Sequence, residues 1–240
     1  MTRDEEALYD ELKTLGLELH IPVPEAFWKL EVMDRAGNPL QIHQQRSHSW
    51  NRNAYNMIMS GLAGIGGNDN TFGGGKMNLK KTDGGITYSA AYTWPLHYWG
   101  NNRTTSQENA GRAYRGALSS TWNGIVLGTG AGAEGFEGYA LDSLITEGVG
   151  AGQFNYAEQA APVKSYNAGT LTYSVEMVRY MNNNSGGLVG VNEVAIYAYW
   201  GIGNYQGIYM ACRDKLGATV NIPNTGQVRV TYTVQMAFPA

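Results

Sequence analysis

The sequence predicts a mainly β protein, an antiparallel and jelly-roll-like β-sandwich with one helix at the N-terminus and one helix after the first hairpin. The main observation is a strict two-residue alternation, which places one set of side chains on each face of a strand. Residues 227–236 alternate polar side chains with the apolar set Val228, Val230, Tyr232, Val234 and Met236. Residues 170–177 repeat this pattern with Leu171, Tyr173, Val175 and Met177. Strands with one buried face are typical of packed antiparallel sheets.

The composition agrees with this fold and gives no indication of a nucleic-acid or membrane partner. Charged residues make up only 15% of the 240 residues, while the chain has 32 glycines and 16 tyrosines, as expected for strands joined by tight turns. Low charge also suits a surface that neighbouring proteins partly cover. The net charge of −3 gives no reason to expect nucleic acid or an anionic membrane as a partner. The sequence contains no signal-peptide pattern and no apolar stretch of bilayer length.

The first part of the chain is expected to form a helical arm. Leu8, Leu12 and Leu15 recur on one helical face, and Gly16 is expected to end the helix. The prolines that follow favour an extended strap. The arm either packs on its own domain or docks on a neighbouring subunit. We therefore expect two parts, an arm and strap at residues 1–24 and a single sandwich domain with long Gly/Asn-rich loops at residues 25–240.

A hairpin and a second helix are expected to follow. Trp28, Leu30 and Val32 alternate with charged residues, and the Asp-Arg-Ala-Gly-Asn segment at 34–38 supplies the turn. The period then changes from strand to helix. Ser49 is expected to cap this helix, whose apolar face is formed by Trp50, Ala54, Met57 and Ile58. Cys212 is expected to be a small buried residue in a later strand.

We find no residue pattern that predicts an enzyme, a cofactor or a metal site. Residues 130–135 match G-x-G-x-x-G, but a dinucleotide site needs this turn to open a long helix, and the flanking residues alternate like strands. The four histidines lack the spacing of zinc ligands. No catalytic pair can be identified among the acids from spacing alone. A flexible loop is therefore the favoured interpretation of residues 130–135.

An aromatic run at residues 88–99 allows two interpretations. Aromatic faces can stack on sugar rings, which would make this run a glycan platform. Cross-strand pairing within the core is the simpler interpretation. The residues of the possible platform are Tyr92, Trp94, Tyr98 and Trp99.

Several ordered segments resemble minor virion proteins of tailed bacteriophages. The segment 43–56, which contains Ser49, Asn53 and Asn56, follows the turn at 34–38 like the opening pattern of that family. Further pieces resemble its later patterns, and these are residues 125–130, 139–145, 192–197, 210–214 and 228–234. The pieces cover about two-thirds of the chain. The chain departs from the family pattern at Ala195, where glycine is frequent, and in its helical N-terminal arm.

The resemblance implies a non-enzymatic structural protein of a virion, made in the cytoplasm of a host bacterium. We expect it to pack against copies of itself and neighbouring virion proteins, with a head-surface decoration or collar position favoured over the tail tip. The expected assembly contacts are Leu8, Leu12, Leu15 and Thr231. The alternative is a receptor- or glycan-binding module of a tail fibre or baseplate. Neither interpretation requires a cofactor.

Overall fold

The computed structural model describes residues 3–63, 77–87, 114–200 and 207–238, and within them the fold is mainly β and antiparallel with two helices, as predicted. The helices are α1 (Arg3–Glu18) and α2 (Arg52–Ala63). The strands are β1 (Pro24–Met33), β2 (Pro39–Arg46), β3 (Leu79–Lys80), β4 (Ile86–Thr87), β5 (Gly124–Gly128), β6 (Asn155–Tyr156), β7 (Val163–Asn167), β8 (Thr172–Asn182), β9 (Val189–Trp200), β10 (Gly207–Ile222) and β11 (Gln227–Ala237).

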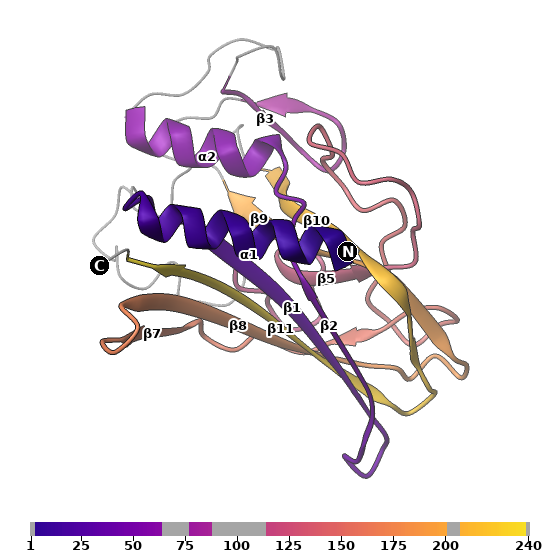
Figure 1. Cartoon of the computed structure of the whole chain (residues 1–240). Coiled ribbons are helices and arrows are strands. Elements are labelled where there is room, and N and C mark those ends of the chain that lie inside the picture. Colours follow the sequence, from indigo (N-terminus) through magenta and orange to yellow (C-terminus); the bar gives the residue numbers. More distant parts are fainter. Residues whose placement is uncertain (1–2, 64–76, 88–113, 201–206, 239–240) are drawn as a thin grey trace.

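The described strands form two main sheets that pack on each other. The larger sheet has the order β2-β1-β11-β8-β6, with β7 also paired to β8. The smaller sheet has the order β10-β9-β5, and β3 and β4 form a separate hairpin. In Figure 1, α1 crosses in front of the strands, and α2 lies above it near β3. Within the described residues, neither helix is long and apolar enough to cross a membrane.

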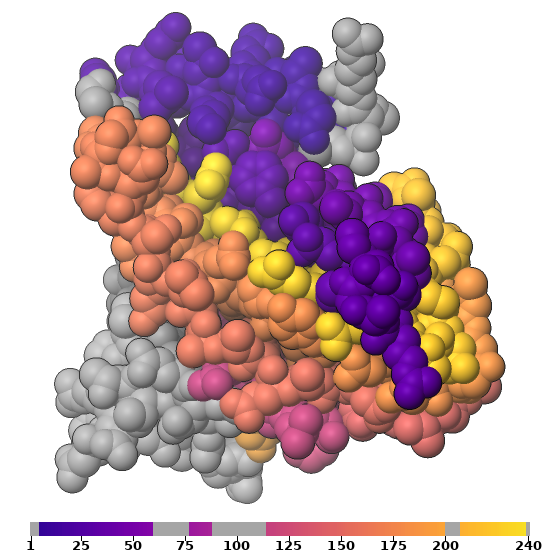
Figure 2. All heavy atoms as spheres, turned by 90° about the horizontal axis from the view of Figure 1, so that it is seen from below, coloured from indigo at the N-terminus to yellow at the C-terminus, as the bar shows by residue number. Residues whose placement is uncertain are grey.

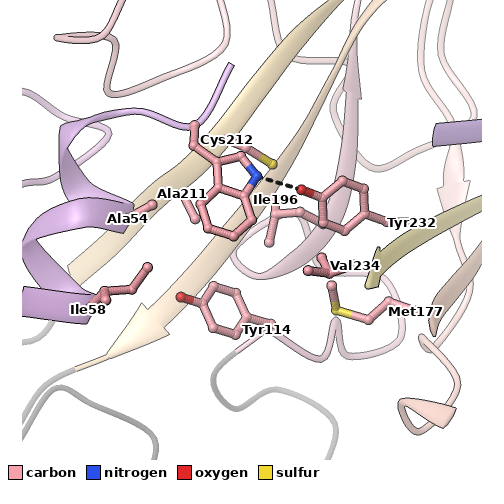
Figure 3. Close-up of a pocket in the computed structure, with 10 residues that line it drawn as sticks. Ala54, Ile58, Tyr114, Met177, Ile196, Ala211, Cys212, Tyr232 and Val234 are labelled. Carbon is pink, nitrogen blue, oxygen red and sulfur yellow. Dashed lines mark hydrogen bonds between the residues drawn. The ribbon is translucent and has the colours of Figure 1, made fainter. Parts of the chain in front are cut away.

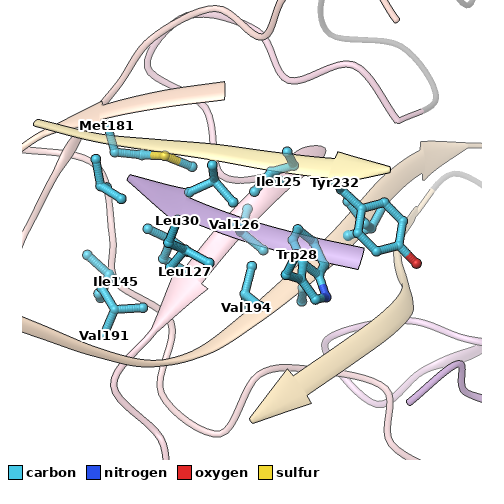
Figure 4. Packing of buried hydrophobic residues seen from close by; sticks show 14 of the residues in the cluster. Trp28, Leu30, Ile125, Val126, Leu127, Ile145, Met181, Val191, Val194 and Tyr232 are labelled. Carbon is cyan, nitrogen blue, oxygen red and sulfur yellow. The ribbon is translucent and has the colours of Figure 1, made fainter. Parts of the chain in front are cut away.

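The first and last strands of the body pair in the middle of the larger sheet. β11 runs antiparallel to β1, so that Trp28 faces Tyr232 and Leu30 faces Val230. Trp28, Leu30 and Val230 are fully buried, and Tyr232 is 3% exposed. The two-residue alternation therefore predicted the buried face of β11 correctly at Val228, Val230 and Tyr232, whereas Val234 and Met236 near its end are only partly buried. A one-residue slip would reverse both faces. Figure 4 shows Trp28, Leu30 and Tyr232 in the core.

The smaller sheet supplies the other half of the core. Ile125, Val126 and Leu127 of β5 are all fully buried, so both faces of this strand are covered. They belong to one continuous cluster with Val194 of β9 and Met181 of β8. Cys212 is 2% exposed in the same cluster, as expected. Burial raises the pKa of its thiol, which therefore stays protonated at neutral pH.

The N-terminal helix ends later than expected. Gly16 does not stop it, because α1 continues to Glu18 and His20 adopts the left-handed conformation that closes it, with a φ of 56°. The Ile21 amide donates to the Gly16 carbonyl at 2.8 Å. A Cβ atom at Gly16 would meet the Val23 side chain, so this glycine lets the strap fold closely over the helix.

The second helix begins with a different cap from the one predicted. It starts at Arg52, and the Ala54 amide donates to the Asn51 side-chain oxygen at 3.3 Å, so Asn51 takes the place expected for Ser49. Asn53 and Lys80 then form a pair of hydrogen bonds. The Asn53 side chain donates to the Lys80 carbonyl at 2.8 Å and accepts from its amide at 2.9 Å. These contacts fasten the small hairpin of β3 and β4 to α2.

The hairpin of β7 and β8 extends beyond the core. Leu171 was expected in a strand, but its φ of 49° places it in the turn. All residues of β7 are exposed, and Tyr173 of β8 is 44% exposed. The alternation near Leu171 therefore does not bury one face here, because no second sheet covers this end. Figure 1 shows β7 and the start of β8 at the outer end of the larger sheet.

One buried cation joins the larger sheet to the long connections. Arg179 of β8 is fully buried, and its guanidinium donates to five main-chain carbonyls at 2.6–3.0 Å. These carbonyls belong to Ala117, Ser120, Asn123, Ile125 and Ala157. Burial lowers the pKa of Arg179 to about 10, which still leaves it charged at neutral pH.

We predict that Arg179→Met destabilises the fold by at least about 3 kcal/mol, because several buried carbonyls would lose their donors at once. Arg115→Met is the matched control. Arg115 also bonds a carbonyl, that of Gln159, but its second partner Glu158 is half-exposed, so we expect a loss below about 1.5 kcal/mol. Urea unfolding of both variants measures the difference. Equal losses would contradict the role assigned to Arg179.

Candidate assembly surface and polar clusters

Helix α1 packs on the body through its charged side chains. Arg46 of β2 is 8% exposed and lies beneath the helix. Its guanidinium is 3.4 Å from the carboxylate of Glu6, 3.7 Å from that of Asp10 and 2.6 Å from that of Glu25. Lys13 reaches Glu25 at 2.9 Å. The inward face of α1 is thus a network of alternating charges.

Glu25 is ionised at neutral pH within this network. Burial opposes the charge on Glu25, but the hydrogen bonds from Lys13 and Arg46 outweigh it and lower the pKa of Glu25. The Tyr9 ring lies 4.8 Å from the guanidinium carbon of Arg46, a cation–π distance. The position of α1 is therefore set by electrostatic contacts around one arginine.

The apolar stripe of α1 points away from the body. Leu8 is 63% exposed, Leu12 49% and Leu15 48%. Leu19, in the turn directly after α1, continues the stripe and is 57% exposed, and its amide donates to the Leu15 carbonyl at 2.9 Å. An amphipathic helix on a globular domain ordinarily buries its apolar face, so α1 is inverted. Figure 2 shows the indigo atoms of α1 as a ridge along one end of the molecule. The three leucines proposed as assembly contacts are accessible, and their role in assembly stays a prediction.

Thr231 is less accessible than expected. It lies on the face of β11 opposite Val230, as the alternation requires, but it is only 7% exposed. Its strand is central in the sheet, with Lys29 on one side and Val178 on the other. Thr231 lines a hollow together with Glu6 of α1, Arg46 and Glu176. Thr231 therefore offers little surface to a neighbour, and α1 is the better candidate.

The proposed glycan platform cannot be placed. Tyr92, Trp94, Tyr98 and Trp99 lie outside the described residues. The geometry of the described part of the chain therefore carries no argument for the receptor- or glycan-binding alternative.

The glycine-rich segment at 130–135 is a loop fixed by carboxylates. The Gly130 amide donates to Glu193 at 3.0 Å, and the Gly132 amide donates to Asp142 at 2.7 Å. No helix follows in residues 129–145, all of which are described. Residues 130–135 therefore form a loop, as predicted. Its amides already have carboxylate partners, whereas a dinucleotide site would leave them for phosphate.

Glu193 and Arg213 hold this loop against the smaller sheet. Glu193 is fully buried and accepts from Arg213 at 2.6 Å. Arg213 also donates to Asp142 at 2.6 Å and to the carbonyls of Gly132 and Ala133 at 3.2 and 3.0 Å. Every charge in this cluster therefore has a hydrogen-bonded partner, as a buried ion pair requires.

A second cluster joins three distant parts of the chain. His48 lies between Asp214 of β10 and Glu134 of the glycine-rich loop, with its Nε2 atom 2.8 Å from Glu134 and its Nδ1 atom 3.3 Å from Asp214. Asp214 is fully buried and also accepts from the Trp28 indole at 2.7 Å and the Ser47 hydroxyl at 2.6 Å. Sequence spacing gave no signal for this cluster, because its members come from three separate segments.

The cluster has the electrostatics of an imidazolium between two anions. The hydrogen bond to Glu134 and the charge of Asp214 raise the pKa of His48 to about 9, against the opposing effect of burial. Burial opposes the ionisation of Glu134, but its bonds from His48 and from the Lys215 amide outweigh it and lower its pKa to about 2. By donor type, these three residues could hold a metal ion, since their ligand atoms lie within 4.8 Å of one another. Each ring nitrogen instead faces a different carboxylate, which favours a structural clasp.

An apolar cavity of about 210 Å³ lies between α2 and the sheets (Figure 3). The Trp50 indole donates to the Tyr232 hydroxyl at 2.8 Å, so these two polar groups of the lining satisfy each other. The cavity therefore offers space but few hydrogen bonds to a ligand. Its lining consists of Trp50, Ala54, Ile58, Tyr114, Met177, Ile196, Ala211, Cys212, Tyr232 and Val234.

The segments that carry the virion-protein resemblance meet in these clusters. His48 and Asn53 belong to the segment 43–56, Gly130 belongs to 125–130, and Glu193 and Asp214 belong to 192–197 and 210–214. All five form hydrogen bonds or ion pairs that fasten a loop or a hairpin. No protein-family model, curated protein or solved structure matched the chain.

We predict that the His48 clasp stabilises the protein near pH 6 and loses this effect in alkali and in strong acid. The folded pKa of His48, about 9, lies above the ordinary 6.5, so its contribution disappears as the pH rises through about 9. The folded pKa of Glu134, about 2, lies below the ordinary 4.5, so its contribution disappears as the pH falls from about 4.5 toward 2. His48→Gln should cost on the order of 1–3 kcal/mol at pH 6.5 and little at pH 10. Urea unfolding across this range, with His43→Gln as control, measures the change. A pH-independent difference would refute the clasp.

Proposed function

We propose that this chain is a non-enzymatic structural component of a bacteriophage particle. It packs against copies of itself and neighbouring virion proteins, at the head surface or collar rather than the tail tip. The observation that carries the assembly role is the inverted helix α1, which uses its charges on its own body and presents its leucines outward. The resemblance of the ordered sequence segments supports the virion as the place of assembly.

The energetics of the stripe fit a docking contact. Full burial of a leucine side chain contributes about 1.5–3 kcal/mol, so covering the exposed half of four leucines gives on the order of 3–6 kcal/mol. Association itself costs several kcal/mol in lost freedom of motion. The stripe therefore strengthens an interface to which other surfaces also contribute. This fits an assembly in which each subunit touches more than one neighbour.

The polar residues of the resembling segments support a structural role. Glu193 and Asp214 are buried acids, and several donors occupy each carboxylate. A carboxylate that acts as a general acid or base must reach a substrate proton within hydrogen-bond distance. Both acids are turned instead toward main-chain and side-chain donors of their own fold. We therefore assign them to stability of the loops.

The assembly role predicts a defined effect of three substitutions. The variant Leu8→Ser/Leu12→Ser/Leu15→Ser should bind more weakly than the wild type to purified particles in a co-sedimentation assay, because it removes the apolar stripe. Its thermal midpoint in dilute solution should change little, since all three leucines are about half-exposed or more in the single chain. The control replaces three leucines that are equally exposed elsewhere, Leu40, Leu118 and Leu188.

Three outcomes test self-association, the role of the leucine stripe and the place in the virion separately. A wild-type chain that sediments as a 26.1 kDa monomer would contradict packing against copies of itself. A large drop in midpoint for the triple variant would show that the stripe belongs to the core. The place of action needs its own measurement, detection of the chain in particles purified from the bacterium that carries its gene. Its absence from those particles would contradict the virion assignment.

A further inference from the structure

We infer that the leucine stripe of α1 docks into an apolar groove of a different protein, and that the rim of this groove is basic where it meets Glu11 and Glu18. The inference rests on the proposed function, because it names the kind of neighbour that one assembly surface accepts. It follows from the spacing of the stripe, the charge of its two flanks and the way α1 is fixed to the body.

The stripe has the spacing of a helix that recognises a partner along one seam. Leu8, Leu12, Leu15 and Leu19 follow one another at intervals of four, three and four residues. This is the alternation of the a and d positions in a heptad repeat. The same spacing supplies the anchors when an amphipathic helix lies in a groove. The seam is about 16 Å long at 1.5 Å per residue.

The two flanks of the seam differ. Glu11 and Glu18 each follow a stripe leucine by three residues, which puts both at g positions on one flank, and both are exposed. The side chains at g positions select the charge of the partner. On the other flank, Tyr9 is half-buried and Gly16 is buried against the body. Only the acidic flank is therefore free to meet a partner.

A second copy of α1 does not satisfy this surface. In an antiparallel pair about a two-fold axis, like flanks face each other, so the glutamates of both copies would repel. In a parallel pair, the glutamates of one copy would face the flank of Tyr9 and Gly16, which already lies against its own body. The ion pairs of Arg46 prevent the helix from turning to relieve either conflict. Copies of this chain must therefore associate through other surfaces.

Charge complementarity gives the chemistry of the partner. Lysine or arginine along one rim would pair with Glu11 and Glu18, while apolar side chains on the floor would receive the leucines. A groove surrounds the seam more completely than a second helix does. It can therefore cover more of the surface of four leucines that are now 48–63% exposed.

Two synthetic helical peptides test this with the full chain. Both carry leucine at a and d positions, and one has lysine at e and g positions while the other has glutamate there. We expect the lysine peptide to bind about tenfold more tightly in fluorescence anisotropy at low salt. The variant Glu11→Gln/Glu18→Gln should lose about three- to fivefold of that affinity. The control Ala36→Lys/Ala161→Lys makes the same change in net charge at exposed positions outside α1, and should keep the affinity.

Each result decides the inference separately from the proposed function. Equal binding of the two peptides, or an unchanged affinity of the glutamine variant, would overturn the basic rim while leaving the sedimentation result intact. A third peptide with residues 3–19 of the chain itself gives another decision. If it binds as tightly as the lysine peptide, α1 pairs with a second copy and the inference is wrong. Preference for lysine that high salt removes would support it.

Discussion

A buried charge must be surrounded by hydrogen-bonding partners, and this requirement holds the long connections of the fold against its two sheets. Arg179 collects five main-chain carbonyls from the connections beside β5 and β6. Glu193 accepts the main-chain amides of Gly130, Asp142 and Ser143. Asp214 accepts from the Trp28 indole in β1, and from the Ser47 hydroxyl and the His48 amide directly after β2. Hydrophobic burial alone does not position such segments, because they contain few large apolar side chains.

This arrangement explains the role of several polar residues that lie close to the core. His48, Asn53, Glu193 and Asp214 bind main-chain groups or one another. Each joins segments that are far apart in the sequence. Replacing one of them would leave a buried polar group without its partner, so such residues are constrained by the fold itself. These residues therefore stabilise the scaffold, and contacts with other molecules are left to the exposed surfaces.

The N-terminal helix supplies one such surface. Arg46 and Glu25 attract the charged face of α1, and the leucines are left facing solvent as a direct consequence. The low proportion of charged residues in the chain is compatible with further covered surfaces, among them the projecting hairpin of β7 and β8 with its exposed Tyr166 and Tyr173. A protein with several accessible apolar elements is suited to contacts with several neighbours.

The sequence by itself determined the fold class, the two helices, and the buried face of β11 and β1, because these follow from periodicities of two and 3.6 residues within single segments. The sequence segments singled out by their patterns also contain Glu193 and Asp214, but the patterns did not predict the roles of these two residues. Tertiary structure alone decided that Thr231 is almost buried in the middle of its sheet, that α1 turns its leucines outward, and that His48 lies between two carboxylates. These outcomes depend on contacts between residues far apart in the chain, and the direction in which a helix faces is set by the charges beneath it.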